Sequence, residues 1–255
     1  MRLIDGAEAI RGDLPSSSTV LIDVPPGAGS SLGTEVHRLS AIQLVRDVLL
    51  AALQDATPVP VTIGGDCGVE LAAVQHAAAR GDVAVVWMDA HADLNTPQSS
   101  PSGSFTGMVL RTLLGDGPAE VRTPSPLRSD RVILAGVRAL DDAESDFIEA
   151  AGVRHILPAD LTAESLAAAV TATGATSLYI HIDLDVIDPS EFACVGAPEP
   201  FGIGFAALLD MIRAAREAVP LSGAGITGFA PASTEAAADD LPSILRIVGA
   251  LTRKL

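Results

Sequence analysis

Short apolar runs alternate along this chain with longer stretches of helical periodicity. The apolar runs of strand length are Thr19–Val24, Pro58–Ile63, Val83–Met88, Arg131–Val137, Leu178–Ile182 and Gly225–Phe229. The stretches between them, rich in Ala and Leu, predict helices at Glu35–Leu53, Val69–Arg80, Phe105–Leu114, Ala143–Ala151, Leu161–Thr171, Phe205–Ala218 and Asp239–Arg253. Strands that are apolar throughout and alternate with helices are typical of a mostly parallel sheet covered on both faces. We therefore expect an α/β fold.

Length and charge narrow the class of protein. The chain has 255 residues, which fits one large α/β domain, so we expect a single domain over residues 1–255. The formal net charge of −16 argues against nucleic acid or an anionic membrane surface as a partner. No apolar stretch approaches the roughly 20 residues that span a bilayer. The N-terminal segment lacks the pattern of a cleaved signal, so we expect a soluble, cytoplasmic protein.

Acidic residues and a histidine follow two of the predicted strands. Asp89, His91 and Asp93 come directly after Val83–Met88, and Asp183 and Asp185 end the run that begins at Leu178. Alternate side chains of an extended strand share a face, so each group should point to one side. Ionised carboxylates at the ends of buried strands are costly without a nearby cation or hydrogen-bond donors. A single such Asp often caps the next helix, but two matched groups predict a metal site.

A third predicted strand ends in TIGGDCGVE, where glycines permit a tight turn beside Asp66 and Cys67. Together with VVWMDAHADLNTP and YIHIDLDVIDPSEF, this segment makes the chain resemble the ureohydrolase superfamily of arginases, agmatinases and formiminoglutamases. The similarity runs from about Val20 to the C-terminus. It implies a three-layer α/β/α sandwich and a homo-oligomer, commonly a trimer or a hexamer.

The resemblance also implies a pair of Mn²⁺ ions sharing a hydroxide that attacks a guanidinium carbon. The residues that match the family's ligands are Cys67, Asp89, His91, Asp93, Asp183 and Asp185. Asp89 and Asp183 would bridge the ions, and Cys67 stands where most of the family has a His. A thiolate is softer than an imidazole, so the ion beside Cys67 should bind weakly or be another divalent metal. The alternative is that Cys67 is only a small buried residue.

Catalytic roles follow from the same resemblance. Asp93 would accept a hydrogen bond from the hydroxide and orient it. His181 lies two residues before Asp183 and shares its face, so it either supports the ligands or packs in the core. Two family residues are absent: the proton-shuttling His is Thr106, and the Glu that pairs with the guanidinium is Gly228. A less basic N-hydroxyguanidine would suffer less than a guanidinium from the loss of that Glu.

Two loops resemble the segments that bind the head group of arginine. Asn95, Ser100 and Ser102 match positions that hydrogen-bond its α-carboxylate, which agmatine lacks. Asp141 and Glu144 match the segment that contacts the α-amino group, although acidic residues at a helix start also complement the helix dipole. The loops favour an amino acid as the small-molecule guanidino substrate.

We therefore expect a metal-dependent amidinohydrolase that converts L-arginine or N-omega-hydroxy-L-arginine to ornithine plus urea or hydroxyurea. A branch of the family that acts on N-omega-hydroxy-L-arginine also has Cys at the position of Cys67. One alternative is a catalytically weakened homologue that binds a metal or an amino acid. Another is a single-metal amidohydrolase, because the deacetylases share this fold and hold one Zn²⁺ with Asp, His and Asp. The number of bound metal ions would separate these functions.

Overall fold

The centre of the protein is a parallel sheet. The structure is a computed structural model that describes residues 2–56 and 59–254. All neighbouring strands in its six-stranded sheet run parallel. In spatial order they are β1 (Val61–Ile63), β6 (Leu221–Thr227), β5 (Ser177–Asp183), β2 (Val83–Met88), β3 (Val132–Ala135) and β4 (Arg154–Ile156). The predicted α/β fold with a parallel central sheet is confirmed.

Both faces of the sheet are buried, because the central strands send alternate side chains into two separate hydrophobic cores. In β2, the side chains at positions 83, 85 and 87 enter one core and those at 84, 86 and 88 enter the other. In β5, Tyr179 enters the first core, whereas Leu178 and Ile180 enter the second. This arrangement explains why the strands read as continuous apolar runs in the sequence.

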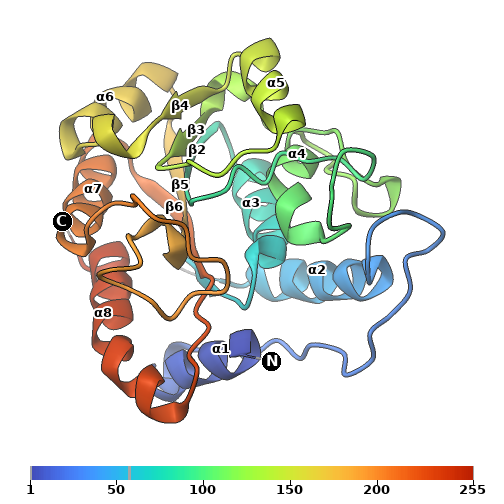
Figure 1. The fold of residues 1–255 in the computed structure, drawn as a ribbon, viewed down its shortest axis with the longest axis horizontal. Coiled ribbons are helices and arrows are strands. Elements are labelled where there is room, and N and C mark those ends of the chain that lie inside the picture. The colour runs from blue at the N-terminus through green and yellow to red at the C-terminus, as the bar shows by residue number, and fades with distance from the viewer. Residues whose placement is uncertain (1, 57–58, 255) are drawn as a thin grey trace.

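Helices cover the two faces and complete three layers (Figure 1). One face packs against α6 (Ala163–Thr173), α7 (Phe205–Ala218) and α8 (Thr234–Thr252), with α1 (Arg2–Gly12) beside α8. The other face packs against α2 (Leu39–Leu53), α3 (Glu70–Ala79), α4 (Val109–Leu113) and α5 (Asp142–Ala151). The sheet therefore lies between two helical layers, as the predicted α/β/α sandwich requires.

The strand predicted at Thr19–Val24 is wrong. This segment forms no strand in the described part of the chain, and most of its apolar side chains lie at the surface, with Val20 75% exposed, whereas Ile22 is partly buried against the core. Leu21 and Val24 are exposed as well. An apolar run forms a strand only where a neighbouring strand accepts it, and composition alone does not show whether such a neighbour is present.

Two elements of the structure were not predicted. Helix α1 contains Gly6 and Gly12, which lower helix propensity, but it buries Ile10 in the core. Gly6 is required there because a Cβ at this position would overlap the carbonyl of Phe229. Strand β4 has only 3 residues and is an edge strand paired with β3, so its sequence carries little periodicity.

Several predicted boundaries also shift. The helix predicted from Glu35 begins at Leu39, because Arg38 adopts a left-handed backbone with φ of 60°. The strand predicted at Pro58–Ile63 begins at Val61, and Pro58 lies outside the described residues. Across residues 2–56 and 59–254, the structure contains no helix with the length and apolar character needed to cross a membrane.

Candidate metal centre

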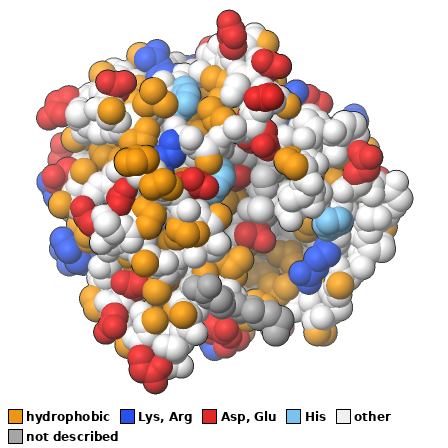
Figure 2. Space-filling view, viewed as in Figure 1, with side chains coloured by type: hydrophobic (Ala, Val, Ile, Leu, Met, Phe, Trp, Pro, Cys, Tyr) orange, Lys and Arg blue, Asp and Glu red, His pale blue; other side chains and the backbone are white. Residues whose placement is uncertain are grey.

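The predicted metal ligands lie at the carboxyl ends of adjacent strands. Asp89 follows β2, Asp183 ends β5, and Cys67 lies in the short 3₁₀ helix between β1 and α3. Because the strands are parallel, these ends meet at one edge of the sheet, where open α/β folds bind their ligands. Figure 2 shows that the protein is hollowed near the middle of this view, with acidic and histidine side chains at the edge of the hollow.

Asp89 lies between two groups of possible ligands. Its Oδ1 accepts a hydrogen bond of 2.6 Å from the backbone N–H of His91 and lies 3.4 Å from that residue's Nδ1. Its Oδ2 lies 3.3 Å from His181 Nε2 and 3.7 Å from Cys67 Sγ. The groups that could each hold a metal ion are Asp89, His91 and Asp185, and Cys67, Asp89, Asp93 and His181. The two groups share Asp89, which could therefore bridge two cations.

The first group is held by backbone hydrogen bonds. His91 Nδ1 lies 3.1 Å from Asp185 Oδ2, and Asp185 Oδ1 accepts a bond of 3.0 Å from the N–H of Ala90. Burial alone would lower the pKa of His91, but hydrogen bonds to Asp185 and Asp89 raise it to about 11. A proton or a cation is therefore strongly favoured between these carboxylates, and a bound cation would displace the proton.

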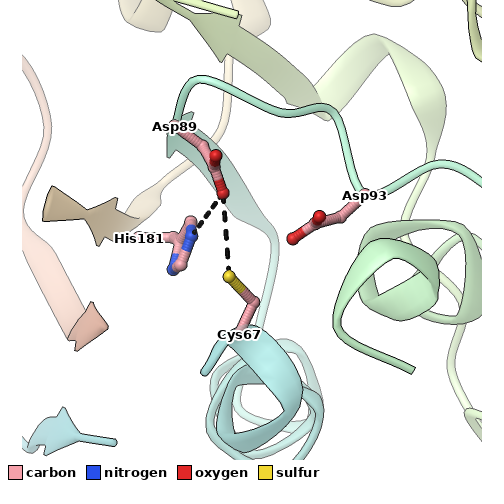
Figure 3. A group of neighbouring side chains, drawn as sticks. All are labelled: Cys67, Asp89, Asp93 and His181. Carbon is pink, nitrogen blue, oxygen red and sulfur yellow. Dashed lines mark hydrogen bonds and ion pairs between the residues drawn. The ribbon is translucent and has the colours of Figure 1, made fainter. Parts of the chain in front are cut away.

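The second group is more deeply buried and contains the thiol (Figure 3). Asp93 adopts a left-handed backbone with φ of 53°, which is costly for a residue other than glycine and turns its side chain toward this group. Its Oδ2 is buried without a hydrogen-bond partner among the described residues. Burial and the charge of Asp89 raise the pKa of Asp93, and burial raises the pKa of the Cys67 thiol. A cation here would satisfy the unpaired oxygen.

Asp183 lies against the second group. Its Oδ2 is 3.4 Å from Cys67 Sγ and accepts a hydrogen bond of 2.8 Å from the hydroxyl of Thr227. Its Oδ1 accepts a bond of 3.0 Å from the N–H of Asp185. The structure thus brings all the residues predicted as ligands to one place. Oxygen and nitrogen donors fit a hard divalent ion in the first group, and the added thiol suits a softer ion in the second.

The predicted substrate residues form a loop that is tied to α5. Asn95 is buried, its amide donates a bond of 2.8 Å to Asp141, and its carbonyl accepts one of 2.8 Å from Ser99. Glu144 is 5% exposed and accepts bonds from the N–H groups of Leu94 and Asp141, at 2.9 and 3.0 Å. Both carboxylate oxygens of Glu144 therefore accept hydrogen bonds from backbone N–H groups, so Glu144 holds the loop in position and stabilises the start of α5.

The two predicted serines retain donor capacity. Ser100 Oγ accepts a bond of 3.1 Å from the N–H of Gly103, and Ser102 Oγ accepts one of 3.2 Å from the N–H of Ser104. The hydroxyl hydrogens remain able to donate to an anion.

Gly228 lies where any larger residue would be strained and would displace the side chain of Asp183. Its φ is 85°, and a Cβ there would overlap the carboxylate of Asp183. Its N–H donates a bond of 2.9 Å to the carbonyl of Gly65. A Glu at this position, which the resemblance to the family implies, would therefore not fit without moving Asp183.

Two polar residues that support the centre were not predicted. Glu70 is fully buried at the start of α3, where its Oε2 accepts a bond of 2.6 Å from the hydroxyl of Tyr179. Tyr179 belongs to the same face of β5 as His181 and Asp183, so the period of two could have revealed it. A single carboxylate among the apolar residues of α3 was the signal for Glu70.

A third residue that was not predicted, Arg138, supports the rim. Its guanidinium donates hydrogen bonds to backbone carbonyls on several loops, including those of Asp185 at 2.7 Å and Glu199 at 2.8 Å. These bonds fix the backbone that carries Asp185.

Comparisons with known proteins agree with this geometry. Residues 13–242 match the family model described as the Arginase family. The chain is 32% identical over 219 residues to the N(omega)-hydroxy-L-arginine amidinohydrolase of Streptomyces lavendulae, covering 82% of this chain and 77% of that protein. It is 29% identical over 201 residues to the arginase of Bacillus caldovelox, covering 72% of this chain and 67% of that protein.

Solved structures show the same fold. The structure of Entamoeba histolytica arginase in complex with L-ornithine superposes with a TM-score of 0.81 at 24% identity, covering 90% of this chain and 82% of that chain. The family model covers most of the chain, the solved structures share its fold, and the chain belongs to the arginase family.

Proposed function

We propose that this protein is a metal-dependent amidinohydrolase that cleaves a C–N bond of an arginine-like amino acid, L-arginine or N-omega-hydroxy-L-arginine. The products would be ornithine and urea or hydroxyurea. The observation that carries this proposal is the pair of ligand groups sharing Asp89 at the edge of the sheet. Mn²⁺ fits the oxygen and nitrogen donors of Asp89, His91 and Asp185.

The ligands supply the chemistry together with the ions they hold. A bound divalent cation lowers the pKa of water and stabilises negative charge that develops on the substrate. Asp93, with one oxygen unpaired and buried, can accept a hydrogen bond from the attacking water and direct it. Asp183 is fixed by Thr227 and by the N–H of Asp185, so its carboxylate stays in place during turnover.

The loop that begins at Asn95 supports an amino-acid head group. Ser100 and Ser102 can donate hydrogen bonds to an α-carboxylate, and Asp141 is an exposed carboxylate joined to the start of this loop by the amide of Asn95. Without a carboxylate at Gly228, the site lacks one anion for a guanidinium, which favours the less basic N-hydroxyguanidine. The relative from Streptomyces lavendulae, an N(omega)-hydroxy-L-arginine amidinohydrolase, agrees with this preference.

The test is ornithine formation from each substrate by protein loaded with Mn²⁺, with metal content measured on the same sample. We expect ornithine from at least one substrate, and more rapidly from N-omega-hydroxy-L-arginine. An Asp89→Asn variant is the control, because it removes the carboxylate common to both groups. Metal-loaded protein that forms no ornithine from either substrate would refute the proposed activity.

A second candidate function is a single-metal amidohydrolase. It is favoured by one observation, that Asp89, His91 and Asp185 form a complete ligand set without any residue of the second group. One tightly bound ion per chain, together with amide hydrolysis, would support this function. Two ions per chain would support the amidinohydrolase, and absence of bound metal would instead support an amino-acid-binding homologue.

A further inference from the structure

His181 points one ring nitrogen at the second ligand group and the other at a buried carboxylate. Nε2 lies 3.3 Å from Asp89 Oδ2, and Nδ1 lies 3.7 Å from Glu70 Oε1. The ring is fully buried and stacks on Trp87, with 3.8 Å between ring centroids. Stacking fixes the plane of the ring, so the nitrogen facing the group cannot turn away from it without repacking the core.

The carboxylate behind His181 is itself held in place. Glu70 Oε2 accepts a bond of 2.6 Å from the hydroxyl of Tyr179, which leaves Oε1 facing the imidazole. Gly225 makes room for it, because a Cβ at that position would overlap the Glu70 carboxylate. A metal-binding His usually gives its second N–H to a carboxylate or a carbonyl, which fixes its orientation and raises its basicity. Tyr179 and Glu70 lie behind His181 in the order that such a chain requires, with a hydrogen bond between Tyr179 and Glu70 and an ion-pair distance of 3.7 Å, too long for a hydrogen bond, between Glu70 Oε1 and His181 Nδ1.

The distances from His181 and Cys67 to Asp89 match those between ligands of one ion, and the possible ligand atoms of all four residues lie within 4.8 Å of one another. With bond lengths of about 2.0–2.3 Å, donors around a tetrahedral Zn²⁺ are separated by about 3.4 Å for N to O and about 3.6 Å for S to O. The corresponding separations here are 3.3 Å from His181 Nε2 to Asp89 Oδ2 and 3.7 Å from Cys67 Sγ to the same oxygen. Asp93 Oδ2, buried and without a hydrogen-bond partner among the described residues, is available as a fourth donor.

We propose that His181 is a direct ligand of the second ion, in a site formed by Cys67, Asp89, Asp93 and His181, and that this site takes a softer ion such as Zn²⁺ rather than Mn²⁺. In this arrangement His181 supplies the imidazole that the turn at Cys67 lacks, from a different strand. The inference deepens the proposed function by assigning its second metal site, but it makes no claim about turnover.

Selectivity follows from the donors. Most divalent ions of this series bind nitrogen and sulfur more tightly than Mn²⁺ does, so a simple preference for Zn²⁺ would not distinguish the two groups. The distinguishing quantity is the ratio of Zn²⁺ to Mn²⁺ affinity at each site. This ratio should be larger where the thiolate and His181 bind than at Asp89, His91 and Asp185.

Co²⁺ is the probe for this site, because it replaces Zn²⁺ and absorbs light. We expect metal-free protein to bind two Co²⁺ per chain, one of them with a near-ultraviolet thiolate-to-cobalt charge-transfer band. In the NMR spectrum of the cobalt protein we expect a hyperfine-shifted, slowly exchanging imidazole N–H, because His181 is buried while His91 is partly exposed. Competition with Zn²⁺ and Mn²⁺ then gives the two affinity ratios.

Substitutions assign the signals to residues. His181→Phe keeps the stacking on Trp87 and removes both nitrogens, so cobalt affinity at the thiolate site should fall by at least about tenfold and the shifted N–H should disappear. Tyr179→Phe keeps His181 and should weaken the site by a smaller factor, through Glu70. The matched control is His155→Phe, since His155 Nε2 contacts the carbonyl of Val137 on the far edge of the sheet.

The results separate this inference from the proposed activity. The ligand assignment is wrong if His181→Phe binds Co²⁺ at the thiolate site with the affinity of the wild type. It is also wrong if the NMR spectrum of the wild-type cobalt protein contains no slowly exchanging, hyperfine-shifted imidazole N–H. Because the NMR experiment uses the unsubstituted protein, an unfolded variant does not prevent this decision. The expected cobalt spectra without any ornithine formation would instead support His181 as a ligand and refute the amidinohydrolase.

Discussion

Gly228 offers a sharp test of how the last strand supports the metal centre. In a Gly228→Ala variant, the new Cβ would overlap the carboxylate of Asp183 in a backbone with φ of 85°. Gly152 is a matched control, because its φ is 63° and a Cβ there would have no atom within 4 Å. The pair of variants separates the backbone cost from the effect on Asp183.

The backbone cost should be similar at the two positions. A left-handed backbone costs an L-residue about 1–2 kcal/mol, and the reduced entropy of the unfolded chain offsets about 0.4–1 kcal/mol of that cost. This backbone cost should lower the free energy of unfolding by on the order of 1 kcal/mol in each variant, or about 2–4 °C in Tm for a chain of this size, and Gly228→Ala should lose more because its Cβ also displaces Asp183. Differential scanning fluorimetry of the metal-free proteins measures this loss.

The metal affinity should differ between the two variants. Asp183 must rotate away from the new Cβ and give up its 2.8 Å bond from Thr227. A hydrogen bond to a charged group contributes about 1.5–3 kcal/mol, so Gly228→Ala should bind metal about 10- to 100-fold more weakly. Gly152→Ala should bind metal as the wild type does in a calorimetric titration. Equal affinities in both variants would show that the position of Asp183 does not depend on Gly228.

Three further predictions follow from the ligand groups and the loop. Cys67→His should raise the Mn²⁺ content measured after equilibration with Mn²⁺, because an imidazole suits that ion better than a thiolate does; unchanged content would show that Cys67 does not face a metal. The pKa values of His91 and His181 are raised from 6.5 to about 11 and about 10. The protonated imidazoles therefore stabilise the metal-free fold fully below pH 6.5, and this contribution is lost as the pH rises through the raised values. The increase in Tm on adding metal should therefore grow from pH 6.5 to 9, and a constant increase would contradict the cited pKa shifts. Glu144→Gln should lower the free energy of unfolding by about 1–3 kcal/mol and raise KM, because an amide N–H would face a backbone N–H. Glu149→Gln, at an exposed position of α5, is the control and should change neither quantity. Equal melting curves for the two variants would show that Glu144 does not hold the loop.

The sequence predicted the composition of the metal centre better than its geometry. A period of two placed Asp89, His91 and Asp93 on one face of an extended strand, but β2 ends at Met88. The left-handed backbone of Asp93 turns it to the second group, while His91 joins the first. The residues are those expected, but a turn rather than a strand separates them. A backbone reversal at a non-glycine residue leaves no periodic signal in a sequence.

Long-range contacts explain most of what the sequence did not predict. The bond between Tyr179 and Glu70 joins residues separated by 109 positions, so neither residue indicates the other without knowledge of the topology. The apolar segment at Thr19–Val24 shows the opposite error, because its local composition is that of a strand but most of its apolar side chains are exposed. The two-sided burial of β2 was predictable, since it depends only on the continuous apolar run.

Charge balance relates two departures from the family pattern that lie far apart in the sequence. The resemblance described above matches Gly228 to a Glu and Cys67 to a neutral His. A thiol bound to a divalent ion loses its proton, so Cys67 in the metal-bound site adds one negative charge where Gly228 removes one. The two places are close, because Cys67 Sγ lies 3.7 Å from the hydroxyl of Thr227, the residue before Gly228. The two replacements leave the total charge of the side chains around the ions unchanged, but the negative charge now lies on a metal ligand, Cys67, and no longer on a residue that would face the substrate. Under the proposed function, a guanidinium would lose a direct partner while the ions would keep theirs, as expected for a substrate less basic than arginine.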